Sequence, residues 1–187
     1  MVTWSALLLP ALASTAFVFV ASSVIHMVLQ LHKPDYGQLS NEDEVRAAVG
    51  RGAPAPGQYV VPHAADGKAM ASPEFCAKME AGPNLLVYVG PRGVPKMPAF
   101  LGRWIAYTFL VSLVVGYIAR ATLAPGANYL QVFQVVGVSA WLAYSWQGPS
   151  DWIWKFKPTS VVLRGFLDGL VYAAVTAGAF GWLWPSA

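Results

Sequence analysis

The sequence predicts an all-α polytopic membrane protein, with four transmembrane helices and a small α+β extramembrane domain between helices 1 and 2. Composition is the first reason, because 56% of the 187 residues are hydrophobic and only 11% are charged, which is too apolar for an ordinary soluble domain. Charge distribution is the second, because 14 of the 21 charged residues lie between Lys33 and Lys96. The apolar stretches on either side are therefore nearly free of charge.

The first region, residues 1–32, is predicted to be a transmembrane helix. Residues 4–31 carry no charge and are long enough to cross a hydrocarbon core of about 30 Å at about 1.5 Å per residue. A cleaved signal peptide is the competing interpretation. The stretch has no basic segment before it and exceeds the apolar core of about 7–15 residues that such peptides have, so we expect it to stay in the protein.

Residues 33–97 are predicted to form the small polar α+β domain. Helices are expected over about 41–49 and 73–81, and strands over 58–61 and 85–89. The second helix has the clearest signals, with Ser72 at the N-cap, Pro73 at the first position and Gly82 just past the end. So few elements bury little surface, so this domain is expected to depend on the bilayer or a partner for stability.

Residues 98–187 are predicted to form a three-helix transmembrane region, from apolar stretches at 99–119, 129–146 and 161–184. The segment 147–160 mixes aromatic residues with lysines and is expected to lie in the membrane interface. Tryptophan favours the same level of the bilayer. The predicted interfacial anchors are Trp4, Trp104, Trp146, Trp152, Trp154, Trp182 and Trp184.

The basic residues predict the orientation of the chain in the membrane. Lys33, Lys96, Lys155 and Lys157 flank the two loops on one side of a four-span arrangement, whereas the other side has only Arg120. Basic residues near span ends are retained in the cytoplasm. The polar domain is therefore expected in the cytoplasm with both termini outside, a layout typical of small inner-membrane proteins of bacteria.

Small residues recur every four positions in the last apolar stretch and so share one helical face, which favours close helix packing in lipid. This face is expected to pack within the chain or to contact another subunit. Its residues are Gly165, Gly169, Ala173, Ala177 and Gly181.

Several polar residues interrupt the apolar stretches and are candidates for an intramembrane role. They are His26, Gln131, Gln134, Arg164, Asp168 and Tyr172. Asp168 is expected either to pair with Arg164 one turn earlier, or to begin a polar track for a proton or ion with Tyr172 and Thr176. His26 is expected to hydrogen-bond a neighbouring helix, because the other apolar stretches hold no second histidine to share a haem.

No metal site and no cofactor are predicted. His32, His63 and Cys76 are the other residues with soft ligand atoms, and none is at zinc-like spacing from another, so a site would have to assemble in three dimensions. Signatures of common catalytic sites are absent, and so is a basic stripe for nucleic acid. The sequence does not indicate an enzyme.

The expected function is therefore that of a non-catalytic accessory, scaffold or assembly subunit of a larger membrane complex. Its partners would be the lipid bilayer and other membrane subunits or further copies of the chain. The alternative is a small oligomeric transporter, or an ion- or proton-conducting membrane protein, that uses Asp168.

Overall fold

The computed structural model describes residues 1–186, and most of these residues are helical. The chain divides into two compact units. One is a helical unit, formed by residues 1–36 together with the chain from Lys96 onward, and the other is a smaller unit, Gly37–Pro95. Each unit is described by itself below.

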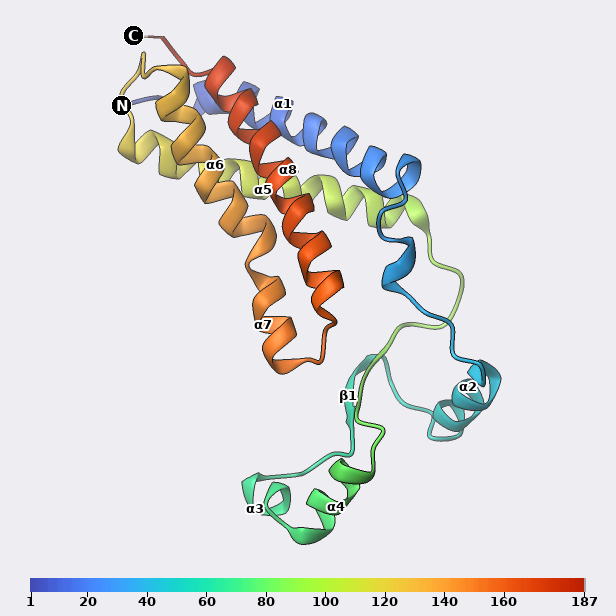
Figure 1. Cartoon of the computed structure of the whole chain (residues 1–187). Helices are drawn as coiled ribbons and strands as arrows, with labels where there is room; N and C mark the ends of the chain where they lie inside the picture. The colour runs from blue at the N-terminus through green and yellow to red at the C-terminus, as the bar shows by residue number, and fades with distance from the viewer. Residues whose placement is uncertain (187) are drawn as a thin grey trace. The chain divides into compact units, whose positions relative to one another are not determined.

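The helical unit contains the long helices of the chain. In Figure 1, α1 runs beside α5, and α6 runs beside α8; α1 also packs on α8, and α5 on α6. The elements are α1 (Trp4–Ser23), the π-helix η1 (Val24–Val28), the 3-10 helix η2 (Lys33–Asp35), α5 (Met97–Thr122), α6 (Tyr129–Ser145), α7 (Gln147–Trp154) and α8 (Thr159–Trp182).

Three of these helices are long and apolar enough to cross a membrane: Trp4–Val28, Met97–Thr122 and Thr159–Trp182. Their outward faces carry large apolar side chains that stay exposed, among them Leu9, Leu110, Val114, Leu163 and Leu167. Exposing such a surface to water costs about 25 cal/mol per Å². Lipid removes that cost, so the chain is an integral membrane protein.

The core of the helical unit lies between α1, α5, α6 and α8. Its fully buried side chains are Leu7, Val18, Val115, Val132, Val136 and Phe180. Gly116 of α5 makes room for the Phe180 side chain of α8, because a Cβ atom added at Gly116 would lie 3.1 Å from the Phe180 ring.

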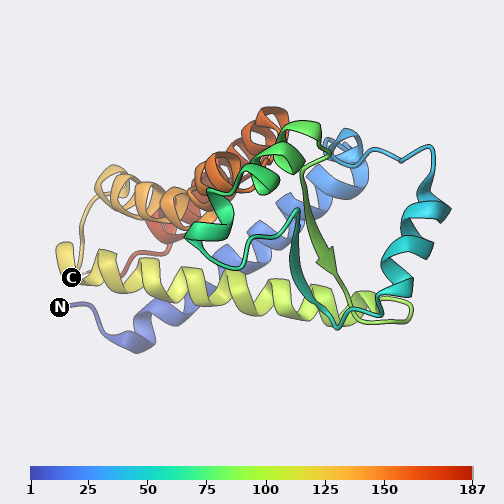
Figure 2. The ribbon, with the colours of Figure 1, turned by 90° about the horizontal axis from the view of Figure 1, so that it is seen from below.

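Both termini lie at the same end of the helical unit (Figures 1 and 2). Arg120, near the end of α5, donates a hydrogen bond to the carbonyl of Val2 and lies over the ring of Trp4. The turn after α5 holds the C-terminal segment, because the N–H of Gly126 donates to the carbonyl of Pro185 at 2.8 Å. α1 and α6 therefore begin at this end, and α5 and α8 finish there.

The smaller unit holds two strands that pair antiparallel, with Gly57 opposite Val89 and Val61 opposite Leu85. None of residues 37–95 is fully buried, so this unit has no core of its own. Its elements are α2 (Glu42–Arg51), β1 (Gly57–Val61), α3 (Gly67–Met70), α4 (Pro73–Ala81) and β2 (Leu85–Val89).

The predicted helix at 73–81 is confirmed, together with its signals. The Ser72 hydroxyl accepts a hydrogen bond from the N–H of Phe75, and Gly82 ends the helix at a positive φ of 58°. Glycine reaches that region of φ without the steric cost that a Cβ atom imposes. The strand predicted at 85–89 is confirmed as β2.

Candidate metal centre

The end of the first apolar helix folds back on itself and brings two histidines together. At η1 the N–H of Leu29 bonds the carbonyl of Val24 at 2.9 Å, five residues back, and Gln30 then takes a left-handed φ of 50°. The rings of His26 and His32 consequently stack, with centroids 4.5 Å apart and an angle of 11° between their planes. π-Helices are frequent at functional sites because they redirect side chains in this way.

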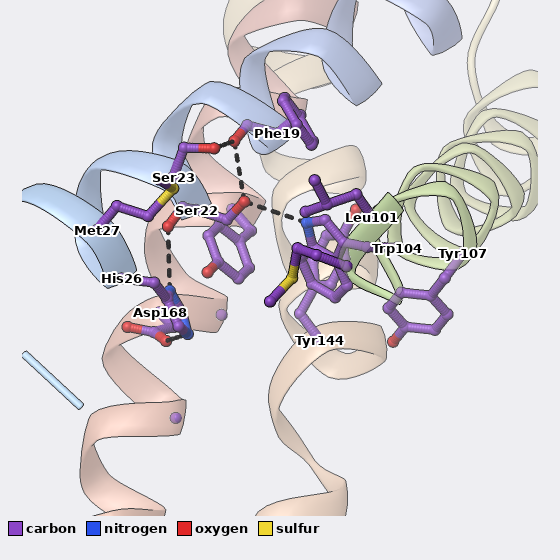
Figure 3. Close-up of a pocket in the computed structure, with 14 residues that line it drawn as sticks. Phe19, Ser22, Ser23, His26, Met27, Leu101, Trp104, Tyr107, Tyr144 and Asp168 are labelled. Atoms are coloured by element: carbon purple, nitrogen blue, oxygen red, sulfur yellow. Dashed lines mark hydrogen bonds and ion pairs between the residues drawn. The ribbon is translucent and has the colours of Figure 1, made fainter. Parts of the chain in front are cut away.

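Asp168 of α8 meets the two histidines. Its Oδ2 atom lies 2.7 Å from Nε2 of His32 and 4.0 Å from Nε2 of His26. Asp168 is only 8% exposed, and Figure 3 shows its carboxylate beside the ring of His26. One atom of each residue can therefore serve as a ligand, and these three atoms lie within 4.8 Å of one another.

The outer nitrogen of each imidazole has an acceptor that fixes the ring. Nδ1 of His26 lies 3.0 Å from the carbonyl oxygen of Ser22, and Nδ1 of His32 lies 2.6 Å from Oδ2 of Asp35. Carbonyl and carboxylate oxygens accept hydrogen bonds, so each Nδ1 carries a proton and donates it. In a neutral ring the Nε2 atom then has a free lone pair that faces Asp168.

Asp35 is itself held by Arg164, whose Nε and Nη2 groups donate to its Oδ1 atom. Burial alone raises the pKa of Asp35, but the hydrogen bonds from His32 and Arg164 outweigh it and hold that pKa below its ordinary value. Asp35 is thus ionised, and by accepting the Nδ1 proton it makes Nε2 of His32 a stronger electron-pair donor toward a metal ion. This is the carboxylate–histidine arrangement that orients histidine ligands in metal sites.

The Nε2 atom of His32 is buried and has no hydrogen-bond partner among the described residues, although an oxygen of Asp168 lies 2.7 Å away. The contact is short without the geometry of a hydrogen bond. A buried polar atom left without a partner is costly. A cation that both the nitrogen and the oxygen ligate would remove the cost.

The structure corrects one of the two sequence interpretations of Asp168. Arg164 does not pair with Asp168, and its partner is Asp35. The reason is the fold-back after η1, which puts the carboxylate of Asp35 within reach of the guanidinium. His26 also bonds its own helix, at Ser22, rather than a neighbouring one.

The sequence indicated His32 only as a residue with a soft ligand atom, without a site, and it did not indicate Asp35. Their spacing of three residues, directly after an apolar stretch that contains His26, was the available signal. His63 and Cys76 lie in the smaller unit, outside this cluster.

The small residues of α8 face α6. A Cβ atom at Gly169 would lie 1.8 Å from Oγ of Ser145, and one at Gly181 would lie 2.7 Å from the ring of Tyr129. Ala173 and Ala177 between them are buried. Gly165 differs, since a Cβ atom there would meet nothing within 4 Å.

The remaining polar candidates lie apart from the histidines. Gln131 closes a capping box at the start of α6, where it exchanges hydrogen bonds with Asn128. Gln134 is exposed on the same helix. Tyr172 is buried, and its ring contacts those of Trp104 and Tyr144.

The tryptophans predicted as anchors fall into three groups. Trp4 stacks on Tyr117, and Trp184 donates to the carbonyl of Ala124, both at the end that holds the termini. Trp104 faces inward, where its N–H donates to Ser22. The others lie on exposed or half-buried surface around α7 and at the end of α8: Trp146, Trp152, Trp154 and Trp182.

Comparison of the chain with protein-family models, curated proteins and solved structures finds no match.

Proposed function

We propose that the chain is a metal-binding membrane protein that holds one divalent transition-metal ion at His26, His32 and Asp168. The observation that carries the proposal is the cluster of His26, His32 and Asp168, whose three candidate ligand atoms lie within 4.8 Å of one another. Nε2 of His32 forms no hydrogen bond with the described residues there and contacts the Asp168 carboxylate, at 2.7 Å. Imidazole nitrogen with one carboxylate oxygen is a donor set that suits zinc and iron(II).

The distances support this proposal. Two ligands at about 2.0–2.1 Å from a zinc ion, at a tetrahedral angle, are about 3.4 Å apart. Oδ2 of Asp168 lies nearer than this to His32, at 2.7 Å, and farther than this from His26, at 4.0 Å. Binding therefore requires that the His26 ring approach and the His32 ring retreat by less than about 1 Å, and that the two stacked rings turn so that both Nε2 atoms point at the ion.

The chemistry of such a site follows from its three protein ligands. A zinc ion bound by three side chains keeps a fourth position for water or for another molecule. The His26 side chain is 48% exposed, so that position is accessible from outside the bundle. The site is therefore suited to binding or polarising an oxygen group rather than to a purely structural role.

The finer topology belongs to the same proposal: four spans, with α6 as the shortest, the smaller unit in the cytoplasm and both termini outside, in a bacterial inner membrane. The 17 residues of α6 extend about 25 Å, a little short of the hydrocarbon core. The four-span topology is supported by the position of the helix ends. α6 begins at the end of the helical unit that holds both termini, and α8 ends there, so α6 and α8 run in opposite directions.

Two other functions remain as proposals. An accessory or scaffold role is supported by the smaller unit, which has no core and would gain stability from a partner. The small-residue face of α8 gives it less support, since that face packs on α6. An ion- or proton-conducting role is supported by Tyr172 and Thr176, which are buried one and two turns beyond Asp168.

Metal analysis of the purified full chain tests the metal proposal. After incubation with Zn²⁺ or anaerobic Fe²⁺ and desalting, we expect about one ion per chain, and a Co²⁺-loaded sample with visible bands of a four- or five-coordinate ion. His32→Ala and Asp168→Asn should lose the ion, and His63→Ala is the matched control that should keep it. Wild-type protein without stoichiometric metal, or equal loss in His63→Ala, would overturn the proposal.

A further inference from the structure

A large cavity adjoins the proposed metal position within the helical unit. Its volume is about 720 Å³, within the range of about 300–1,000 Å³ that small-molecule sites have. His26 and Asp168 form part of its wall, so a molecule inside it can reach the metal ligands directly (Figure 3).

The cavity has one polar end and one apolar body. Beyond His26 and Asp168, its wall is mainly apolar and comes from all four long helices, with Ser22 and Ser23 as the other polar aliphatic residues. Those that define the body are Phe19, Leu101, Trp104, Tyr107, Tyr144 and Tyr172.

The aromatic wall is held in place by its own contacts. The Tyr144 ring packs edge-on against Tyr107 at 6.1 Å and against Tyr172 at 5.6 Å. Trp104 donates to Ser22 at 3.1 Å, and Tyr107 donates to the carbonyl of Ala143 at 3.2 Å. Fixed aromatic side chains preserve an apolar cavity at little cost in conformational entropy when a ligand binds.

The wall lies largely at the depth of the membrane. Phe19, Trp104 and Tyr172 all belong to helices that are long and apolar enough to cross it. An occupant therefore arrives from the bilayer, with an apolar part that is already dissolved in lipid. Its polar part is expected at His26 and Asp168, because the Ser22, Ser23 and Tyr107 hydroxyls of the wall already donate to backbone carbonyls.

The net charge of the proposed metal site determines which head group such a molecule should carry. Two neutral imidazoles and one carboxylate leave a divalent ion with one uncompensated positive charge. The Asp35 and Arg164 charges compensate each other. An anionic oxygen group on the open coordination position would neutralise the remaining charge.

We propose that the cavity binds an amphiphile with an anionic oxygen head group, which ligates the metal at His26, His32 and Asp168 while its apolar chain lies along Trp104, Tyr107 and Tyr144. This inference rests on the proposed metal site. A fatty-acid carboxylate and a phospholipid phosphate are two sources of the same head-group chemistry.

Gly165 permits a test that leaves the metal ligands in place. It lines the cavity, and a Cβ atom there would meet nothing within 4 Å, so Gly165→Phe fills the cavity. Gly102 is the matched control, because it also lies in a long apolar helix with nothing within 4 Å but does not line the cavity. Gly102→Phe adds the same side chain elsewhere.

The experiment measures binding of palmitate, phosphatidylglycerol and hexadecanol to the full chain in detergent, with Zn²⁺ or with a chelator. We expect palmitate or phosphatidylglycerol to bind at least about tenfold more tightly than the neutral alcohol, and only with Zn²⁺. Stronger binding of palmitate identifies a fatty acid, and stronger binding of phosphatidylglycerol identifies a phospholipid. Gly165→Phe should weaken binding about tenfold or more and keep its zinc, whereas Gly102→Phe should bind as wild type.

The outcomes separate the two proposals. A chain that binds zinc but no anionic amphiphile overturns this inference and leaves the metal site standing. Equal binding of the alcohol, or binding that survives the chelator, also overturns it, as does full binding by Gly165→Phe. A chain that binds no zinc overturns the proposed function itself.

Discussion

The guanidinium of Arg164 donates to the carboxylate of Asp35, 129 residues earlier in the chain, and that carboxylate accepts the Nδ1 proton of His32. This relay fixes the orientation of a histidine whose other nitrogen faces Asp168. Arg164 and Asp35 thus act on the proposed metal site without touching the ion.

Removing the charge of Asp35 should weaken metal binding without abolishing it. Asp35→Asn retains the shape of the side chain but is a poorer acceptor for His32. Loss of such an outer partner typically lowers metal affinity about 10–100-fold. Zinc affinity, measured by competition with a chelator, should fall by that factor, and Asp43→Asn on the exposed surface of α2 should leave it unchanged. Unaltered affinity in Asp35→Asn would contradict the relay.

Two glycines of α8 should respond oppositely to alanine. At Gly169 the new Cβ atom would lie 1.8 Å from Oγ of Ser145, so Gly169→Ala should lower the free energy of unfolding by about 1–3 kcal/mol. At Gly165 there is open space, so Gly165→Ala should leave the free energy of unfolding unchanged or raise it by about 0.5–1 kcal/mol. Thermal unfolding in detergent measures both.

A variant that removes the clash between the new Cβ atom at residue 169 and Oγ of Ser145 provides the control for these two alanine variants. Ser145→Ala removes the Oγ atom, which has no hydrogen-bond partner among the described residues. The double variant Gly169→Ala with Ser145→Ala should therefore recover part of the lost stability. If the stability changes of Gly169→Ala and Ser145→Ala simply add in the double variant, the contact between residues 169 and 145 is not the cause of the lost stability.

Chemical labelling of Cys76, the sole cysteine, can show on which side of the membrane the smaller unit lies. Cys76 is exposed, so a membrane-impermeant maleimide should reach it only after lysis if the smaller unit faces the cytoplasm. Thr3→Cys in a Cys76→Ser background should label in intact spheroplasts, because the proposed arrangement puts the N-terminus outside. Labelling of Cys76 in intact spheroplasts would contradict the proposed orientation.

Acid should loosen α7 through Asp151. A hydrogen bond from Lys155 holds the pKa of Asp151 below its ordinary value. A group with a lowered pKa contributes stability above its ordinary pKa of about 3.9, and that contribution is lost as the pH falls through the lower folded value.

Hydrogen exchange over residues 147–157, corrected for intrinsic rates, measures this effect. Wild-type protection should fall between pH 6 and pH 3 by an amount that corresponds to about 1 kcal/mol or less. Asp151→Asn should show little dependence on pH. A wild-type profile that matches that of the variant would rule the ion pair out as the cause.

The sequence predicts local features of this chain well. The helix at Pro73–Ala81 follows from the chemistry of Ser72 and Gly82, which acts within one turn. The three long spans follow from length and hydropathy. The fourth span stays a prediction, because the 17 residues of α6 are at the lower limit for crossing.

The candidate site was less predictable, since it depends on backbone geometry that no periodicity reveals. A regular helix through Leu31 would have carried His32 away from His26. Instead η1 and the left-handed Gln30 reverse the chain, and only then do Asp35 and Arg164 meet. Asp168 and Arg164 could be found because charged residues are rare in an apolar stretch. Their partners could not, because these depend on how the chain reverses direction after η1.

The π-helix Val24–Val28 accommodates one more residue in its turn than an α-helix does. Excising a single amino acid there would restore ordinary winding and swing everything downstream by about 100° around the axis. His32 would then be carried away from His26 and Asp168. The proposed ion site therefore depends on one extra residue in the π-helix, and a one-codon deletion there would dismantle the site while leaving all three proposed ligands in the sequence.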